Sequence, residues 1–211
     1  MNILSRVSHW SPRYILARVL EICYHLQVPT DPWLTREANS ILRAILKPSD
    51  VMVEFGSGRS TLWFAARVGR LCSVESDEGW YKRISGQINA LPAGKVSYLY
   101  RPVPDPAGPG SAYSGVLDDF QDSSVDIVLV DGALRDFCAL KAIPKLKAGG
   151  VLVVDNVNWF LPSQSKSPDS VAVDGAPASE GWKQFLGLVK GWQCRWTSSG
   201  VTDTAFYYKP G

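Results

Sequence analysis

Val51-Met52-Val53-Glu54-Phe55-Gly56-Ser57-Gly58-Arg59-Ser60-Thr61 is the stretch that decides the fold of this chain. An apolar run that ends in two closely spaced glycines predicts a β-strand entering a tight turn, with a helix opening at Ser60 or Thr61. Glycine lets the backbone turn tightly and lets a ligand approach the main chain without a Cβ between them. The free N–H groups at the start of the helix face the same ligand. The stretch therefore predicts a binding turn.

An acidic residue follows this turn at a spacing that suits a nucleoside. The next predicted strand, Leu71–Glu75, ends in Glu75, where a carboxylate can accept two hydrogen bonds from a ribose diol. A dinucleotide fold usually has a third glycine three residues after the second, and Thr61 stands there instead. Glu54 would repel a pyrophosphate, but it suits a cofactor that carries a cation. These residues favour S-adenosylmethionine over NAD.

Apolar runs and helical periods alternate along the rest of the chain, which predicts an α/β protein. Val125–Val130 and Val151–Val154 are almost wholly apolar, as in parallel strands covered by helices on both faces. Gly149–Gly150 predicts a turn after the preceding helix, and the short connection Ser198–Asp203 predicts an antiparallel hairpin. The predicted strands are Val51–Phe55, Leu71–Glu75, Val96–Tyr100, Val125–Val130, Val151–Val154, Gln193–Thr197 and Thr204–Tyr208, and the predicted helices are Ser60–Val68, Gly79–Ile88, Tyr113–Phe120, Ala133–Leu146 and Gly181–Lys190.

Two helices are predicted before the first strand. Residues 1–27 form an amphipathic helix with one apolar face, made of Ile15, Val19, Ile22, Cys23 and Leu26. We expect this face to pack on the fold or on a second copy in a homodimer, with membrane contact as the weaker alternative. Thr35 is the predicted N-cap of a helix that runs to Leu46. Residues 1–48 are thus a helical extension of a domain at 49–211, within one structural domain overall.

The composition is that of one ordinary globular domain, with 211 residues, 45% hydrophobic content and a net charge of +2. Lys and Arg are scattered, which argues against a nucleic-acid partner. No apolar run approaches the roughly 20 residues that span a bilayer, and no signal-peptide core opens the chain. The four cysteines lack a Cys-x-x-Cys spacing, so we expect buried free thiols and a cytoplasmic location.

These motifs resemble the class I S-adenosylmethionine-dependent methyltransferases over Pro32–Pro210. Glu54–Gly58 resembles the first motif of that family, Ser73–Glu75 its ribose-binding acid, and Val125–Gly132 and Lys147–Asn156 its fourth and fifth strands. The resemblance implies a Rossmann-like doubly wound sheet of seven strands in the order 3-2-1-4-5-7-6, with strand 7 antiparallel. The candidate cofactor-binding residues are Glu54, Gly56, Ser57, Gly58, Ser60, Thr61, Glu75, Ser76 and Asp131. The adenine contacts match no sharp motif.

Carboxylates also close the fourth and fifth predicted strands. Asp131 ends the fourth, and Asp155-Asn156 ends the fifth, so all three side chains should lie near the cofactor. Their oxygens can bind Mg²⁺ or another divalent cation, an arrangement that resembles the catechol and caffeoyl-CoA type O-methyltransferases. Those enzymes have a Lys where this chain has Leu134. Arg135 follows it, and we expect Arg135 to orient or to bind the substrate. The alternatives are a metal-free role for Asp131 as a base and a purely structural role for these carboxylates.

The sequence therefore predicts an S-adenosylmethionine-dependent methyltransferase that acts on a small molecule at oxygen. The candidate catalytic residues are Asp131, Arg135 and Asp155, the tentative metal ligands are Asp131, Asp155 and Asn156, and Leu161–Ser179 is expected to be a lid that selects the acceptor. Two other functions stay open. One is a cofactor-binding domain or partner subunit without its own chemistry, and the other is an NAD-dependent oxidoreductase.

Overall fold

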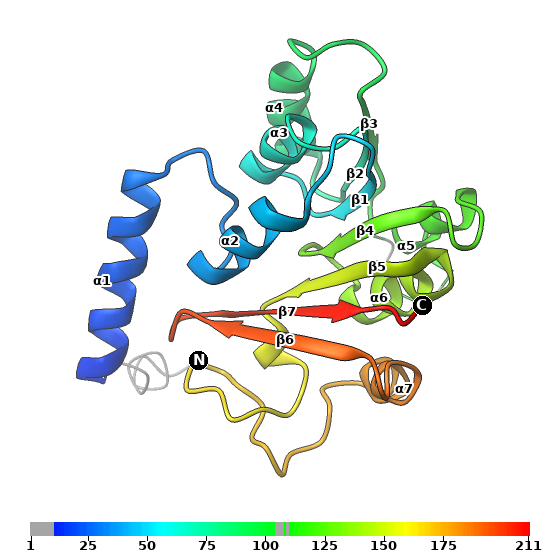
Figure 1. Ribbon diagram of the computed structural model, residues 1–211. Coiled ribbons are helices and arrows are strands. Elements are labelled where there is room, and N and C mark those ends of the chain that lie inside the picture. Colours follow the sequence, from blue (N-terminus) through cyan, green and yellow to red (C-terminus); the bar gives the residue numbers. More distant parts are fainter. Residues whose placement is uncertain (1–10, 104–107, 109) are drawn as a thin grey trace.

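A seven-stranded sheet forms the centre of the molecule (Figure 1). The computed structural model describes residues 11–103, 108 and 110–211. The strand order is β3-β2-β1-β4-β5-β7-β6, and β7 is antiparallel to both of its neighbours. This confirms the predicted order. The strands are β1 (Val51–Phe55), β2 (Arg70–Glu75), β3 (Val96–Tyr100), β4 (Val125–Val130), β5 (Leu146–Asp155), β6 (Gln193–Ser198) and β7 (Asp203–Tyr208).

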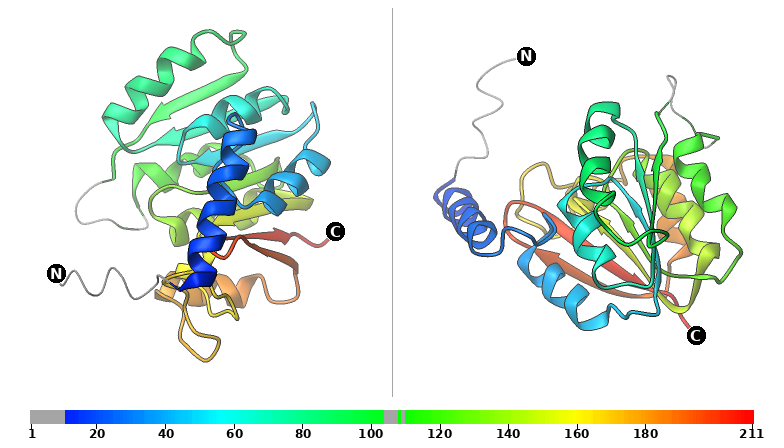
Figure 2. Two further views of the ribbon diagram at one scale, coloured as in Figure 1. Left: turned by 90° about the vertical axis from the view of Figure 1, so that its left-hand side faces the viewer. Right: turned by 90° about the horizontal axis from the view of Figure 1, so that it is seen from above.

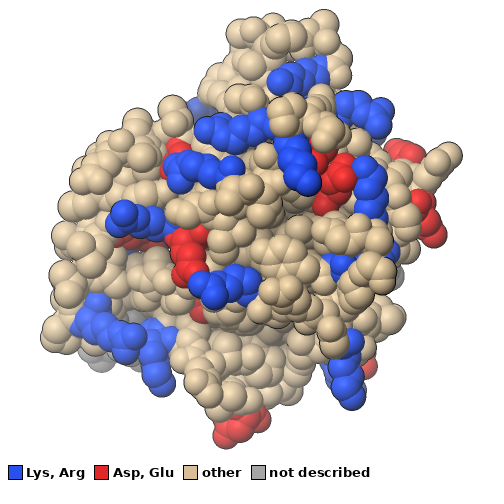
Figure 3. All heavy atoms as spheres, viewed as in Figure 1, with Lys and Arg blue, Asp and Glu red and all other residues tan. Residues whose placement is uncertain are grey.

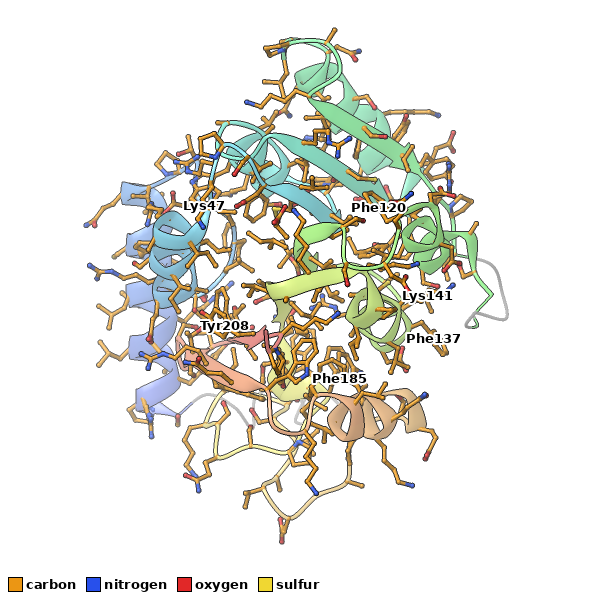
Figure 4. All side chains as sticks on the ribbon, turned by 45° about the vertical axis from the view of Figure 1, so that its right-hand side comes forward. Lys47, Phe120, Phe137, Lys141, Phe185 and Tyr208 are labelled. Atoms are coloured by element: carbon orange, nitrogen blue, oxygen red, sulfur yellow. The ribbon has the colours of Figure 1, made fainter. Side chains whose placement is uncertain are left out.

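Helices cover the sheet on both faces (Figure 2). Alternate residues of each central strand point to opposite faces, so each face has its own apolar core. One core holds α2 and α3, and the other holds α5, α6 and α7, whose Phe185 points toward the sheet (Figure 4) and meets Tyr207 edge-on. The helices are α1 (Pro12–Gln27), α2 (Arg36–Ile45), α3 (Arg59–Ala65), α4 (Glu78–Ile88), α5 (Ala112–Gly115), α6 (Arg135–Lys145) and α7 (Glu180–Leu188), with short 3-10 turns at Val116–Asp119 (η2) and Val157–Trp159 (η3).

The two glycines before the fifth strand do not form the predicted helix-ending turn, so that prediction is wrong. Helix α6 ends at Lys145, and Gly149–Gly150 lies inside β5. The backbone φ of Gly149 is +76°, and two hydrogen bonds of 2.9 Å link Gly149 and Gly150 to Lys209. The pairing of β4 with β5 shifts its register between Val125 and Ile127. The glycines therefore serve a strand irregularity, because glycine tolerates the positive φ found there.

Two other predictions need correction. The helix predicted over 113–120 is shorter and divides into α5 and η2. The four free cysteines are not all buried, because Cys72 and Cys138 are buried whereas Cys23 and Cys194 are exposed. The Thr35 N-cap is confirmed, since its hydroxyl accepts a hydrogen bond from the backbone N–H of Ala38 at 3.1 Å.

Helix α1 lies beyond the carboxyl ends of the parallel strands (Figures 1 and 2). It contacts the β6–β7 hairpin through Glu21, which accepts a hydrogen bond from Ser199, and the segment before α2 through His25, which stacks on Trp33. The part of the predicted helix at 1–10 lies outside the described residues. No helix in the described part of the chain is long and apolar enough to cross a membrane.

Candidate functional site

The turn after β1 is held against the turn after β4. Gly56 has a φ of +92°, and a Cβ on it would lie 2.8 Å from the backbone nitrogen of Gly132. The two turns can approach this closely because neither residue has a side chain. Gly58 is different, because its φ is 174° and a Cβ there would meet only Ser60 Oγ, at 3.8 Å. Space is thus left beside Gly58 at the carboxyl edge of the sheet.

Glu54 lies beneath this turn, fully buried, and does not reach the open space. Its carboxylate accepts hydrogen bonds from the hydroxyls of Ser60 (2.5 Å), Thr61 (2.7 Å) and Ser73 (2.7 Å). Thr61 Oγ1 also accepts from the backbone N–H of Gly58. Burial raises the pKa of Glu54 to about 7, although the three hydroxyls favour its charged form. Glu54, Ser60 and Thr61 therefore fasten the turn to the start of α3.

Glu75 and Ser57 are bound to each other at the end of β2. One oxygen of Glu75 accepts from the backbone N–H and the hydroxyl of Ser57, and the other accepts from the backbone N–H groups of Ser76 and Asp77. Tyr98 Oη lies 2.7 Å from Ser57 Oγ, and Trp80 Nε1 donates to the Ser57 carbonyl at 2.7 Å. A ribose hydroxyl that binds Glu75 would replace the Ser57 hydroxyl.

Asp131 and Asp155 form a pair of interacting acids at the ends of β4 and β5. Burial raises the pKa of Asp131 to about 6 against the opposing effect of Arg135. Burial, followed by the charge of Asp131, raises the pKa of Asp155 well above its usual range. Asp155 also accepts a 2.6 Å hydrogen bond from Thr204 Oγ1. Because two close carboxyls resist double ionisation, Asp155 holds its proton more tightly than an isolated aspartic acid does while Asp131 is charged.

Arg135 holds the ends of these two strands together. Its guanidinium donates to the backbone carbonyls of Gly132, Asp131 and Asp155, and it lies 3.2 Å from Asp131 Oδ1. Only 14% of its side chain is exposed. Since three of its N–H groups are satisfied by the main chain, Arg135 positions the turn after β4. Its contact with a substrate stays a prediction.

The predicted divalent cation is not supported by the side chains around these acids. Asn156 is a left-handed residue at the end of β5, and its amide nitrogen donates to Thr202 at 2.6 Å. Thr204 already binds Asp155, and the Arg135 cation lies beside Asp131. Within the described ranges, His, Cys, Asp and Glu form no group of three or more that could bind a metal ion. The residues therefore fit a metal poorly, and Arg135 supplies the positive charge.

An aromatic cavity of about 310 Å³ opens beside Gly132. Phe160 and Trp182 stack within it with their ring centroids 5.3 Å apart, and Arg135 lies over Phe160. The segment Leu161–Ser179 forms one wall through Ala178 and Ser179. This segment is fastened to the fold, for example by a 2.6 Å hydrogen bond from Ser167 Oγ to Asp203. Trp159 remains exposed.

Several residues of the site were missed by sequence reasoning. The buried hydroxyl of Tyr113 lies under Gly132 and has no hydrogen-bond partner among the described residues. Trp80 and Tyr98 surround Ser57, which accepts from Trp80 through its carbonyl and lies 2.7 Å from Tyr98 Oη through its hydroxyl. None of these aromatic residues has a spacing to the glycine motif that a sequence could reveal, because the fold alone brings them together.

Comparison with known proteins identifies the fold. No family profile matches the chain, and no curated protein matches its sequence. Its structure is similar to that of a methyltransferase-like protein from Silicibacter pomeroyi, with a TM-score of 0.57, 24% identity, and coverage of 86% of this chain and 91% of the other. The chain has the class I methyltransferase fold. Further similar structures of this fold carry diverse descriptions.

One of them, from Staphylococcus aureus, is described as a candidate caffeoyl-CoA O-methyltransferase, with a TM-score of 0.54, 14% identity, and coverage of 98% and 97% of the two chains. Another, from Streptococcus thermophilus, is described as an rRNA methylase, with a TM-score of 0.53, 9% identity, and coverage of 83% and 95%. The class I methyltransferase fold thus leaves the acceptor open. Figure 3 shows Lys and Arg spread among Asp and Glu on one face of this chain, and the absence of a nucleic-acid partner stays a prediction.

Proposed function

We propose that this chain is an S-adenosylmethionine-dependent methyltransferase that acts on an oxygen of a small molecule. The observation that carries the proposal is the open space beside Gly58, at the carboxyl edge of a sheet with the class I methyltransferase order. Ligands of open α/β sheets bind at this edge. A side chain at position 58 would fill the space. The fold without a ligand does not require glycine there, because the backbone is extended and the nearest atom to a Cβ is 3.8 Å away.

The cofactor side of the site is acidic. Four acids lie close enough to affect one another: Glu54, Glu75, Asp131 and Asp155. The pKa of each of Glu54, Asp131 and Asp155 is raised in part by the charge of another of these acids. S-adenosylmethionine, when bound, supplies a sulfonium methyl group for transfer and an ammonium that suits this negative environment. Gly56 and Gly58 line its path, and Glu75 with Ser76 and Ser57 receives the ribose. Ser60 and Thr61 keep the turn in place.

The acceptor side combines a base with an aromatic cavity. Asp131 is ionised above its pKa of about 6, so its carboxylate can take the proton of an acceptor hydroxyl as that oxygen becomes methylated. Arg135 holds Asp131 at the strand ends through a contact of 3.2 Å, and Asp155 lies on the neighbouring strand. Phe160, which is partly exposed at this cavity and backed by the buried Trp182, offers a ring for a small planar acceptor, and Leu161–Ser179, which forms one wall of the cavity, is the lid. Alignment of the acceptor and exclusion of water supply the rest of the rate.

Calorimetric titration with S-adenosylmethionine and with NAD tests the cofactor. We expect S-adenosylmethionine to bind more tightly, and Gly58→Val to lose this binding while its unfolding temperature stays close to that of the wild type. The matched control is Gly86→Val, because a Cβ at Gly86 of α4 meets nothing within 4 Å, and a Cβ at Gly58 meets only Ser60 Oγ, at 3.8 Å. Absence of S-adenosylmethionine binding, or tighter binding of NAD, would overturn the proposal.

A panel of small phenols and other hydroxyl compounds tests the chemistry. We expect one or more to be methylated, with turnover lost in Asp131→Asn and cofactor affinity lowered by no more than a few-fold, because Asp131 is one of several acids around the cofactor. Cofactor binding without turnover on any member of a broad panel, including amines and RNA, would instead indicate a binding subunit without chemistry.

A further inference from the structure

Helix α1 turns its polar side inward and its apolar side outward. The buried residues of the helix are Glu21 and His25, which contact the hairpin and Trp33. Six of the twelve large hydrophobic side chains that are exposed in the described residues belong to this one helix: Ile15, Leu16, Val19, Leu20, Ile22 and Leu26. The expectation that this face packs on its own fold is therefore wrong. Such a concentration of exposed apolar surface marks an interaction site.

Four of these residues form a stripe along α1. Ile15, Val19, Ile22 and Leu26 follow one another in steps of four, three and four residues, and they are 44%, 50%, 44% and 75% exposed. Steps of three and four place the side chains on one side of the helix, in the seam through which one helix packs against another. The expected partner of the stripe is another helix.

The stripe is complementary to itself. If two α1 helices pack in antiparallel directions about a two-fold axis between residues 20 and 21, Ile15 of one copy meets Leu26 of the other. Val19 then meets Ile22, and each contact occurs twice. A two-fold dimer requires such an isologous surface: if a first residue of one copy meets a second residue of the other copy, the second residue of the one copy also meets the first of the other.

The charges on α1 favour a second copy over a lipid surface. Helices that lie on membranes have a polar face rich in Lys and Arg that reaches the headgroups. The polar face of α1 is turned toward the protein instead, and one of its two arginines, Arg18, forms an ion pair of 2.6 Å with Glu21. Arg13 alone is left to attract anionic lipid.

We propose that two copies of this chain associate through antiparallel contact of their α1 stripes. Full burial of an aliphatic side chain removes on the order of 100 Å² from water, so the four partly exposed side chains of the stripe contribute about 200 Å² per copy, against roughly 800 Å² per partner in a stable complex. The dimer is therefore weak, and the fraction of dimer increases as the protein concentration rises.

Sedimentation velocity between about 1 and 200 µM tests the association. The wild type should shift from the 23.2 kDa monomer toward twice that mass, and Val19→Glu with Ile22→Glu should weaken the dimer at least about tenfold. Leu188→Glu is the matched control, because Leu188 is a 51% exposed residue of α7. A wild type that stays monomeric, or a dimer that the double variant leaves unchanged, would overturn the proposal. So would binding of the monomer to phosphatidylcholine–phosphatidylglycerol vesicles that the double variant abolishes.

Disulfide trapping tests the direction of the helices. In a background with Cys23→Ser and Cys194→Ser, Ile15→Cys and Leu26→Cys proteins should cross-link when mixed and oxidised. Neither should cross-link with itself, because the two copies of position 15 lie about 16 Å apart along an antiparallel pair, beyond the reach of a disulfide. Cross-linking of Ile15→Cys with itself would contradict the antiparallel arrangement.

Discussion

The two glycines of the turn after β1 should respond to substitution in opposite ways. Alanine at Gly56 is strained twice, because the φ there is +92° and its Cβ would lie 2.8 to 2.9 Å from the backbone of Asp131 and Gly132. Backbone atoms cannot move aside as a flexible side chain can. Alanine at Gly58 meets neither problem, because the backbone is extended and the nearest atom is 3.8 Å away.

The expected cost of Gly56→Ala is about 3 kcal/mol. A non-glycine residue at this positive φ costs roughly 1 to 2 kcal/mol, and the overpacked contact adds about 1 to 3 kcal/mol. For a domain of this size the unfolding temperature should fall by about 6 to 12 °C. Gly58→Ala should change the stability by less than about 1 kcal/mol, and its sign can be favourable because the unfolded chain loses freedom.

Urea unfolding followed by circular dichroism measures both variants, with calorimetric titration of S-adenosylmethionine beside it. We expect Gly56→Ala to unfold at a lower urea concentration than the wild type. Gly58→Val, which adds a larger side chain than alanine, should lose ligand binding while keeping the stability of the wild type. If Gly56→Ala unfolds at the wild-type urea concentration, the close contact between the two turns does not exist as described. Equal destabilisation of Gly56→Ala and Gly58→Ala would equally refute the distinction between a packing glycine and a binding glycine.

Three further substitutions test the acids and their arginine. Glu54 keeps its proton in the folded state up to its pKa of about 7, above the ordinary 4.5. The wild type therefore loses stability as the pH rises through this window. Urea unfolding at pH 5 and pH 8 measures this loss in free energy of unfolding, and Glu54→Gln should lose about 2 to 3 kcal/mol less than the wild type. Asp131→Asn should lower kcat by roughly 10²- to 10⁴-fold in a methyl-transfer assay with cofactor affinity within a few-fold of the wild type, whereas Asp122→Asn, at an exposed ion pair, should leave kcat unchanged. Arg135→Met should cost about 2 to 4 kcal/mol in the same unfolding assay, because it leaves buried carbonyls and Asp131 without their donor. The control is Lys141→Met, which removes a surface ion pair and should cost less than about 1 kcal/mol.

The positions of the strands were predictable because local patterns agree with the global fold, and their order followed from the resemblance to the class I methyltransferases. Six of the seven predicted strands lie within one residue of their predicted bounds, including both strands of the C-terminal hairpin, whereas β5 begins five residues earlier than predicted, at Leu146. Parallel strands buried on both faces leave little ambiguity in such a pattern. The turn at Gly56–Gly58 and the acids that end β1, β2, β4 and β5 were also predictable, since each follows an apolar run directly.

What the sequence could not reveal is where side chains point when distant segments meet. Gly149–Gly150 has the same local signal in a turn and in an irregular strand, and its pairing with Lys209 decides between them. The periodicity of α1 defines an apolar face, but Glu21 and His25 determine that this face points outward. The sequence predicted that Arg135 orients or binds the substrate, but it could not show that the guanidinium donates to backbone carbonyls after β4 and at the end of β5.

Burial also changes what Glu54 means for the cofactor. The sequence places a full negative charge beside the turn, whereas the folded chain holds this carboxyl beneath three hydroxyls with a pKa of about 7. Glu54 therefore favours a cationic cofactor only as one member of the group of acids at this edge of the sheet. The charge of Glu75 raises the pKa of Glu54, that of Glu54 raises the pKa of Asp131, and that of Asp131 raises the pKa of Asp155. A cationic cofactor relieves this repulsion among the carboxylates, whereas a pyrophosphate adds to it. The selectivity against NAD that we propose thus belongs to the edge of the sheet, and the buried Glu54 would contribute to it through its charge.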